Sequence, residues 1–148
     1  MAQTEESPVI NPFKRGAAAY ADVAVETGVA SADPHRLIVL LYEGALKAIG
    51  QAESALAAGD IAGKGESISK AIQIVEEGLK ASLDENVGGE LAHQLASLYD
   101  YMARRLLFAS LRNDPTGLRE VAGLLGDLKG AWESIGGTAR PSGSLKAA

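Results

Sequence analysis

The chain has two histidines, His35 and His93, which are the side chains best suited to metal binding or proton transfer. His93 follows Glu90 at the Glu-x-x-His spacing found in di-iron helical bundles, because residues three apart lie on one face of a helix. Such a site needs this motif twice, together with two further glutamates. The residue three positions before His35 is Ala32, so the second motif is missing. The sequence therefore predicts no metal site, and His93 is interpreted as a surface histidine.

Residues 59–65, with the sequence GDIAGKG, have a faint similarity to a phosphate-binding loop. A Walker loop has four residues between its glycines and a Ser or Thr after its lysine. Here three residues separate Gly59 from Gly63, Gly65 follows Lys64, and no strand-like pattern precedes the segment. We interpret it as the start of a helix. Neither histidine has neighbours that favour a phosphotransfer role.

The remaining composition leaves little for catalysis. The chain has no cysteine, so it has no thiol nucleophile, disulfide or thiolate metal site. No serine–histidine–acid set or nucleophile elbow is present, and we predict no enzyme activity and no cofactor. The net charge of −5 argues against a nucleic-acid surface. The longest apolar run, at 37–42, is far shorter than the roughly 18 residues of a membrane span, so no membrane insertion is expected.

Apolar residues recur at helical spacing over four segments, residues 34–58, 61–83, 90–114 and 115–135. Asp33 with Pro34, Asp60, and Asp114 with Pro115 are typical of helix starts. Short turns between long helices force neighbours to lie antiparallel. The sequence predicts an all-α, antiparallel up-down four-helix bundle over residues 31–136. A disordered arm at 1–16, a short N-terminal capping segment at 17–30 and a flexible tail at 137–148 complete the expected organisation.

The predicted core follows the apolar spacing of each helix. In the segment 61–83 the heptad positions are Ile61, Ile68, Ile72, Val75 and Leu79, with Ile74 off that row. A longer loop is expected at 82–89, ended by the glycines at 88 and 89. The inward-facing residues expected in the last two helices are Leu91, Leu95, Leu98, Met102, Leu106, Ala109, Leu118, Val121, Leu125, Leu128, Trp132 and Ile135.

The first and third helices carry more apolar residues than one side of a four-helix core uses. The residues that cannot all face inward are Leu40, Tyr42, Tyr99, Tyr101, Leu107 and Phe108. Exposed apolar area usually marks a protein-binding surface, and a groove between helices accepts an amphipathic helix. The same surplus also fits self-association, or an N-terminal segment that folds back over it. The apolar periodicity alone leaves these alternatives open.

Several motifs, in order and at consistent spacing, resemble the FliS family of flagellar secretion chaperones. They are AYADVAVE at 19–26, SADPHRLI at 31–38, LYEGA at 41–45, SKAI at 69–72, GGE at 88–90, LYDYMARRL at 98–106 and Ala131 with Trp132. The resemblance covers nearly all of the predicted folded chain. It implies a four-helix bundle in which the N-terminal segment and its tyrosine, here Tyr20, cover part of the binding surface.

The resemblance also implies a function. Such a protein is a cytoplasmic export chaperone that binds the disordered C-terminal segment of flagellin one to one. It prevents premature polymerisation, keeps flagellin competent for flagellar type III secretion and helps to deliver it to the export gate. A bundle adaptor that binds another amphipathic helix, or that self-associates, is the alternative. The expected partner-binding residues are Tyr20, Leu41, Tyr42, Ile72, Tyr99 and Met102.

Overall fold

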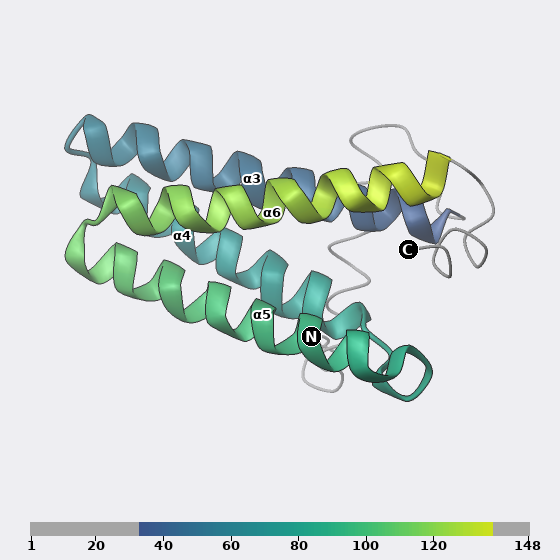
Figure 1. Ribbon diagram of the computed structural model, residues 1–148. Coiled ribbons are helices and arrows are strands. Elements are labelled where there is room, and N and C mark those ends of the chain that lie inside the picture. Colours follow the sequence, from purple (N-terminus) through teal and green to yellow (C-terminus); the bar gives the residue numbers. More distant parts are fainter. Residues whose placement is uncertain (1–32, 138–148) are drawn as a thin grey trace, which may run out of the picture.

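The computed structural model describes residues 33–137, which form long helices joined by short turns (Figure 1). Helix α3 spans Pro34–Ala57, α4 spans Ile61–Gln73, α5 spans Glu85–Arg112 and α6 spans Pro115–Gly137. Between α4 and α5 the chain continues as a π-helical turn, η2 (Ile74–Leu79), and a 3₁₀ turn, η3 (Lys80–Ser82). The predicted all-α fold is confirmed.

Acidic caps start the first two helices where the sequence predicted them. The side chain of Asp33 accepts a hydrogen bond from the Arg36 amide, and that of Asp60 accepts one from the Gly63 amide. Each bond satisfies an amide that the first turn of a helix leaves without a partner. A Cβ atom at Gly63 would lie 2.3 Å from an Asp60 carboxylate oxygen. The Asp60 carboxylate occupies the space that a Cβ atom at Gly63 would fill, so the glycine suits this helix start without a shift of the aspartate.

The helix that follows α4 differs from the prediction, because η2 winds with i→i+5 hydrogen bonds. Ile74, Val75 and Leu79 of this turn are all buried. The expectation that Ile74 lies off the core row was wrong, because its side chain packs against α3, where a Cβ atom at Gly44 would lie 3.5 Å from its Cδ1 methyl group. Ile61 was also expected in the core, but 53% of it is exposed. It is the first residue of α4, next to the turn that follows α3.

Helix α5 begins earlier than expected. Asp84 caps the amides of Asn86 and Val87, and residues of the predicted 82–89 loop form helical turns from Glu85 onward. Gly89 interrupts the helix with a φ of 59°, a left-handed conformation that glycine adopts without steric cost. The predicted break at this glycine is therefore confirmed, and the predicted loop before it was wrong.

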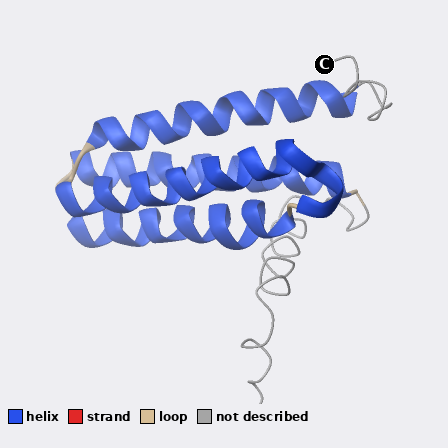
Figure 2. Cartoon of the chain, turned by 60° about the horizontal axis from the view of Figure 1, so that its bottom comes forward, coloured by secondary structure: helices blue, strands red, loops and turns tan. Residues whose placement is uncertain are grey.

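The helices pack as a four-membered ring in cross-section. Helix α3 lies against α4 and α6, α5 also lies against α4 and α6, and α3 is diagonal to α5 (Figure 1). Consecutive long helices run antiparallel, as the sequence colours of Figure 1 show. Short connections join them at the ends of the bundle (Figure 2). This arrangement confirms the bundle that the short turns predicted.

The core is built from small and medium-sized aliphatic side chains. Residues buried in it include Ala45, Ile49, Leu106, Leu118 and Leu125. Leu128, Trp132 and Ile135 continue the α6 row but are half-buried. Leu91, expected in the core, is 56% exposed. Met102, Leu106 and Ala109 are buried as expected. Ala92, Ala96 and Ala103 are buried as well, and their small side chains give a weak sequence signal.

No helix within residues 33–137 is both long enough and apolar enough to cross a bilayer. The predicted arm at 1–16, the capping segment at 17–30 and the tail beyond residue 137 lie outside the described residues.

Candidate binding surface

The structure places the predicted partner-binding residues mainly in the core. Leu41, Tyr42, Tyr99 and Met102 are at most 2% exposed. Ile72 is half-buried against the core cluster, and Tyr20 lies outside the described residues. The four buried side chains come together inside the bundle, where they have no free surface to offer. Their contact with a partner stays a prediction.

The hydroxyl groups of the two buried tyrosines are hydrogen-bonded to each other. Their hydroxyl oxygens lie 2.6 Å apart, so Tyr42 of α3 and Tyr99 of α5 are joined across the diagonal of the bundle. Burial raises the pKa of Tyr42 above its usual value, and the neighbouring Tyr99 hydroxyl and Trp132 indole partly offset that rise. Both tyrosines were among the residues that could not all face inward, and both are buried because each hydroxyl group has its polar partner inside the core.

Exposed apolar side chains gather on the outer side of α5. Leu107 is 49% exposed, Phe108 46% and Leu111 69%. Leu107 and Phe108 were among the residues that could not all face inward, whereas Leu111 was not singled out. The signal was nevertheless present in the sequence, because Leu111 lies four residues after Leu107 on the same side of the helix. We call Leu107, Phe108 and Leu111 the α5 patch.

A shallow open groove of about 670 Å³ runs between α4 and the C-terminal part of α5. It is lined by Ile61, Ala62, Gly65, Glu66, Ser69, Lys70, Gln73 and Ser110. A Cβ atom at Gly65 would meet no other atom within 4 Å, so the groove is open above this glycine. The groove combines apolar atoms, hydroxyl groups and charges, which suits a peptide better than a small apolar ligand.

Lys64 fastens the two helices that form the groove. It is only 5% exposed, and its ammonium group donates a hydrogen bond of 2.7 Å to the Ser110 carbonyl. That carbonyl lies in the last turn of α5, where a positive charge also suits the helix dipole. The lysine of the GDIAGKG segment therefore supports the packing of α4 on α5.

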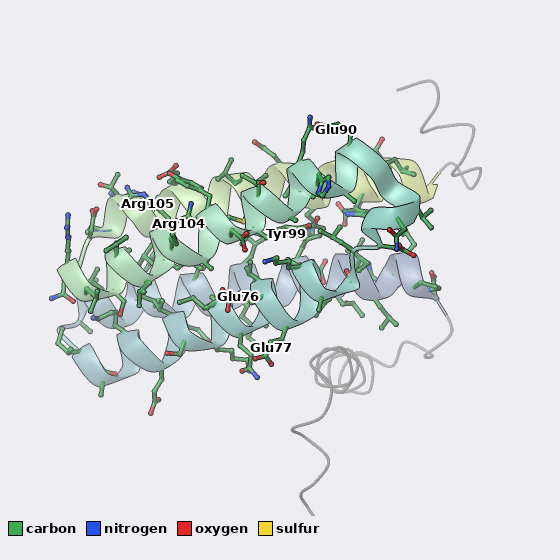
Figure 3. The ribbon with its side chains drawn as sticks, turned by 90° about the horizontal axis from the view of Figure 1, so that it is seen from below. Glu76, Glu77, Glu90, Tyr99, Arg104 and Arg105 are labelled. Atoms are coloured by element: carbon green, nitrogen blue, oxygen red, sulfur yellow. The ribbon has the colours of Figure 1, made fainter. Side chains whose placement is uncertain are left out.

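A polar cluster joins α5 to α6 on the other side. The Tyr101 hydroxyl and the Arg105 guanidinium both donate to the Glu120 carboxylate, and Arg105 also lies 3.6 Å from Asp114. The Tyr101 hydrogen bond, followed by that of Arg105, lowers the pKa of Glu120. The Arg105 side chain therefore binds α6. Its neighbour Arg104 is instead exposed on the outer side of α5 (Figure 3).

The histidines are separated in the fold. His35 donates through Nε2 to the Trp132 carbonyl and packs edge-on against the Trp132 ring, with 5.1 Å between ring centroids. His93 is exposed near the start of α5, and Glu90 accepts a hydrogen bond from Gln94. Within residues 33–137, no cluster of three or more His, Asp or Glu side chains is arranged to hold a metal ion.

Comparison with known proteins gives one consistent family. The family model described as "Flagellar protein FliS" matches residues 16–139. The chain is 52% identical over 120 residues to the Flagellar secretion chaperone FliS of Salmonella typhimurium, covering 81% of this chain and 89% of that protein. It is 44% identical over 119 residues to the protein of the same name from Escherichia coli, covering 80% and 88%. It is 45% identical over 116 residues to the Flagellar secretion chaperone FliSB of Pseudomonas aeruginosa, covering 78% and 91%.

Proposed function

Because the chain belongs to the FliS family of flagellar secretion chaperones, we propose that it binds the C-terminal segment of flagellin in the cytosol. By holding that segment it prevents flagellin from polymerising before export and keeps it competent for flagellar secretion. Delivery to the export gate belongs to the same proposal. One observation carries it: the family match extends across all the described helices and is shared with relatives named secretion chaperones.

The α5 patch supports this proposal. A bundle that buries its core well still leaves Leu107, Phe108 and Leu111 about half exposed or more on one stretch of helix. Exposed apolar area of this kind is used for protein contacts, and a groove lies beside it between α4 and α5. The binding role predicted for Leu41, Tyr42, Tyr99 and Met102 requires rearrangement, because these side chains are enclosed by the core.

Binding of a disordered segment has a characteristic energetic course. The segment loses conformational entropy as it becomes ordered on the bundle, and apolar contact offsets that loss. The chain contributes surface and shape, and no chemical step is required of it. A non-enzymatic role is consistent with the way the polar residues are used, since Lys64, Tyr101 and Arg105 are engaged in packing helices together.

The test compares intact flagellin with flagellin that lacks its C-terminal segment, both from the same bacterium as the chaperone. The proposal predicts a one-to-one complex on a sizing column with the intact protein and none with the truncated one. It also predicts that seeded polymerisation of intact flagellin is delayed by an equimolar amount of the chain. An unchanged elution position with intact flagellin would contradict the proposal. A chain that elutes as a dimer and ignores flagellin would favour the self-associating alternative.

A further inference from the structure

The outer side of α5 carries two parallel rows of side chains. Arg104, Phe108 and Arg112 follow each other at intervals of four residues, and Leu107 and Leu111 form the neighbouring row. Residues four apart lie one above the other on a helix, so each row is continuous. All five side chains are exposed. The α5 patch is thus bordered by a guanidinium at each end of its outer row.

The two guanidiniums are available to a partner. Within residues 33–137, no carboxylate lies at ion-pair distance from Arg104 or Arg112. The Arg112 guanidinium instead sits 5.6 Å from the centroid of the Phe108 ring, which orients it over the patch. Arg105 differs, because it is bound to Glu120 and Asp114. A local concentration of positive charge therefore stands out on a chain whose net charge is −5.

The inner row adjoins the groove. Arg105 faces α6. Leu107, two residues later, is rotated by about 200° from Arg105 around the helix axis. The row of Leu107 and Leu111 is therefore on the α4 side of α5. Ser110, three residues after Leu107, lines the groove together with Ile61 and Gly65 of α4. Groove, apolar row and basic row therefore follow one another across the outer side of α5, starting from α4, and Arg112, seven residues after Arg105, is the member nearest to α6. Figure 3 shows α4 and α5 from this side.

We propose that this surface binds a helical part of the flagellin C-terminal segment, with Arg104 and Arg112 selecting carboxylates that flank its apolar stripe. The inference rests on the proposed function and adds the place and the chemistry of recognition. Arginine, phenylalanine and leucine side chains around a groove are well suited to hold an amphipathic helix, and arginine and aromatic residues are enriched at protein interfaces. A protein segment fits better than a membrane surface because the site includes a groove.

The spacing of the arginines defines the ligand further. They are eight residues apart on α5, which is about 12 Å along the helix axis. A bound helix that lies along α5 meets both guanidiniums with carboxylates seven or eight residues apart on one flank. Apolar residues between them, at three- and four-residue intervals, contact Leu107, Phe108 and Leu111. The binding partner is therefore an amphipathic helix with one acidic edge.

The test uses a synthetic peptide of the flagellin C-terminal segment and the full chain, with Kd measured at several salt concentrations. The double variant Arg104→Gln, Arg112→Gln should weaken binding about tenfold at low salt, because each exposed ion pair contributes modestly. It should also reduce the dependence of Kd on salt. Lys47→Gln is the matched control. Lys47 is exposed on α3, diagonal to α5, so its loss of one positive charge should leave Kd unchanged.

Two further variants test the apolar row and the groove. Leu111→Ser removes an exposed apolar contact and should weaken binding about tenfold at all salt concentrations. Gly65→Phe places a ring in the groove, where the structure has open space, so the fold should be retained while binding is blocked. The melting temperature of each variant is measured first. Every variant is altered at an exposed or open position, so all should melt close to the unaltered chain.

The outcomes separate the two proposals. Failure of the unaltered chain to bind the peptide overturns the proposed function and this inference with it. Binding that is equally tight in the arginine, Leu111→Ser and Gly65→Phe variants overturns the inference and leaves the proposed function standing. A free chain that is dimeric until Leu111→Ser makes it monomeric, with peptide binding unaltered, would assign the surface to self-association and would also overturn the inference.

Discussion

The hydrogen bond between Tyr42 and Tyr99 is expected to contribute measurably to stability. Tyr42→Phe and Tyr99→Phe each remove the bond that joins the two hydroxyl groups across the bundle. A net hydrogen bond contributes about 1 kcal/mol, and leaving a buried donor without its acceptor costs about 1 to 3 kcal/mol. Each single variant should therefore lower the free energy of unfolding by at least about 1 kcal/mol.

The assay is equilibrium unfolding in urea for the two single variants and the double variant. The shared bond is counted in both single variants, so the double variant should lose about 1 kcal/mol less than their sum. For the 105 residues of 33–137, 1 kcal/mol corresponds to about 4 to 5 °C in melting temperature. Strict additivity of the two single losses would refute the stabilising bond between Tyr42 and Tyr99.

The same hydroxyl gives a pH dependence with a definite sign. Burial raises the pKa of Tyr42 above the value of 10.0 expected for an exposed tyrosine. Above pH 10 the unfolded chain releases this proton while the folded chain keeps it, so the free energy of unfolding falls as pH rises. Tyr42→Phe should make that alkaline fall shallower, which titration of the unfolding free energy between pH 9 and 11 will measure. An unchanged slope would contradict the burial of this hydroxyl.

Three further changes have definite expected results. Gly78→Ala should lower the free energy of unfolding by about 1 kcal/mol, because its Cβ would lie 3.1 Å from a Leu41 methyl group. Gly126→Ala, at an open helical position, should raise it by about 0.5 to 1 kcal/mol, and equal urea midpoints for these two variants would contradict the packing. Lys64→Met should lower the free energy of unfolding less than Lys64→Ala in the same assay, because the methionine side chain replaces the buried apolar part of the lysine side chain. Glu120, whose pKa is lowered by Tyr101 and Arg105, stabilises the fold above pH 4.5 and loses that effect as pH falls. Glu120→Gln should therefore make acid unfolding less steep, and an unchanged acid profile would contradict this.

The arrangement of the helices could be predicted from the sequence because local signals agreed with each other. Asp33 and Asp60 cap helices where caps were expected, and the α6 row from Leu118 to Leu125 is buried as its spacing predicted. Each of these signals acts within one or two turns of a helix. Agreement between neighbouring signals leaves the up-down bundle as the simplest way to bury every row.

The parts that were missed depend on contacts between helices. Ile74 is buried because it packs against Gly44 of α3, and that contact has no signal in the heptad row of its own helix. Tyr42 and Tyr99 were counted among the residues that could not all face inward. Both are nevertheless buried, because the hydroxyl group of each is hydrogen-bonded to that of the other tyrosine, 57 positions away along the chain. A pairing between distant residues has no signature in the spacing of either helix.

The exposed surface was only partly predictable for a related reason. The surplus of apolar residues in the third helix was visible in the sequence, and Leu107 and Phe108 are indeed exposed. Which members of the surplus face outward depends on how α5 rotates against α4 and α6. In the observed rotation Ala96 and Ala103 are buried, and the Leu107 and Leu111 row faces solvent.

Calorimetric titration of the full chain with the C-terminal segment of flagellin from the same bacterium tests the central claim most directly. The account predicts one-to-one binding with a negative heat-capacity change, because apolar surface on α5 and on the segment is removed from water. The absence of heat at several temperatures, together with separate elution of chain and peptide on a sizing column, would contradict it.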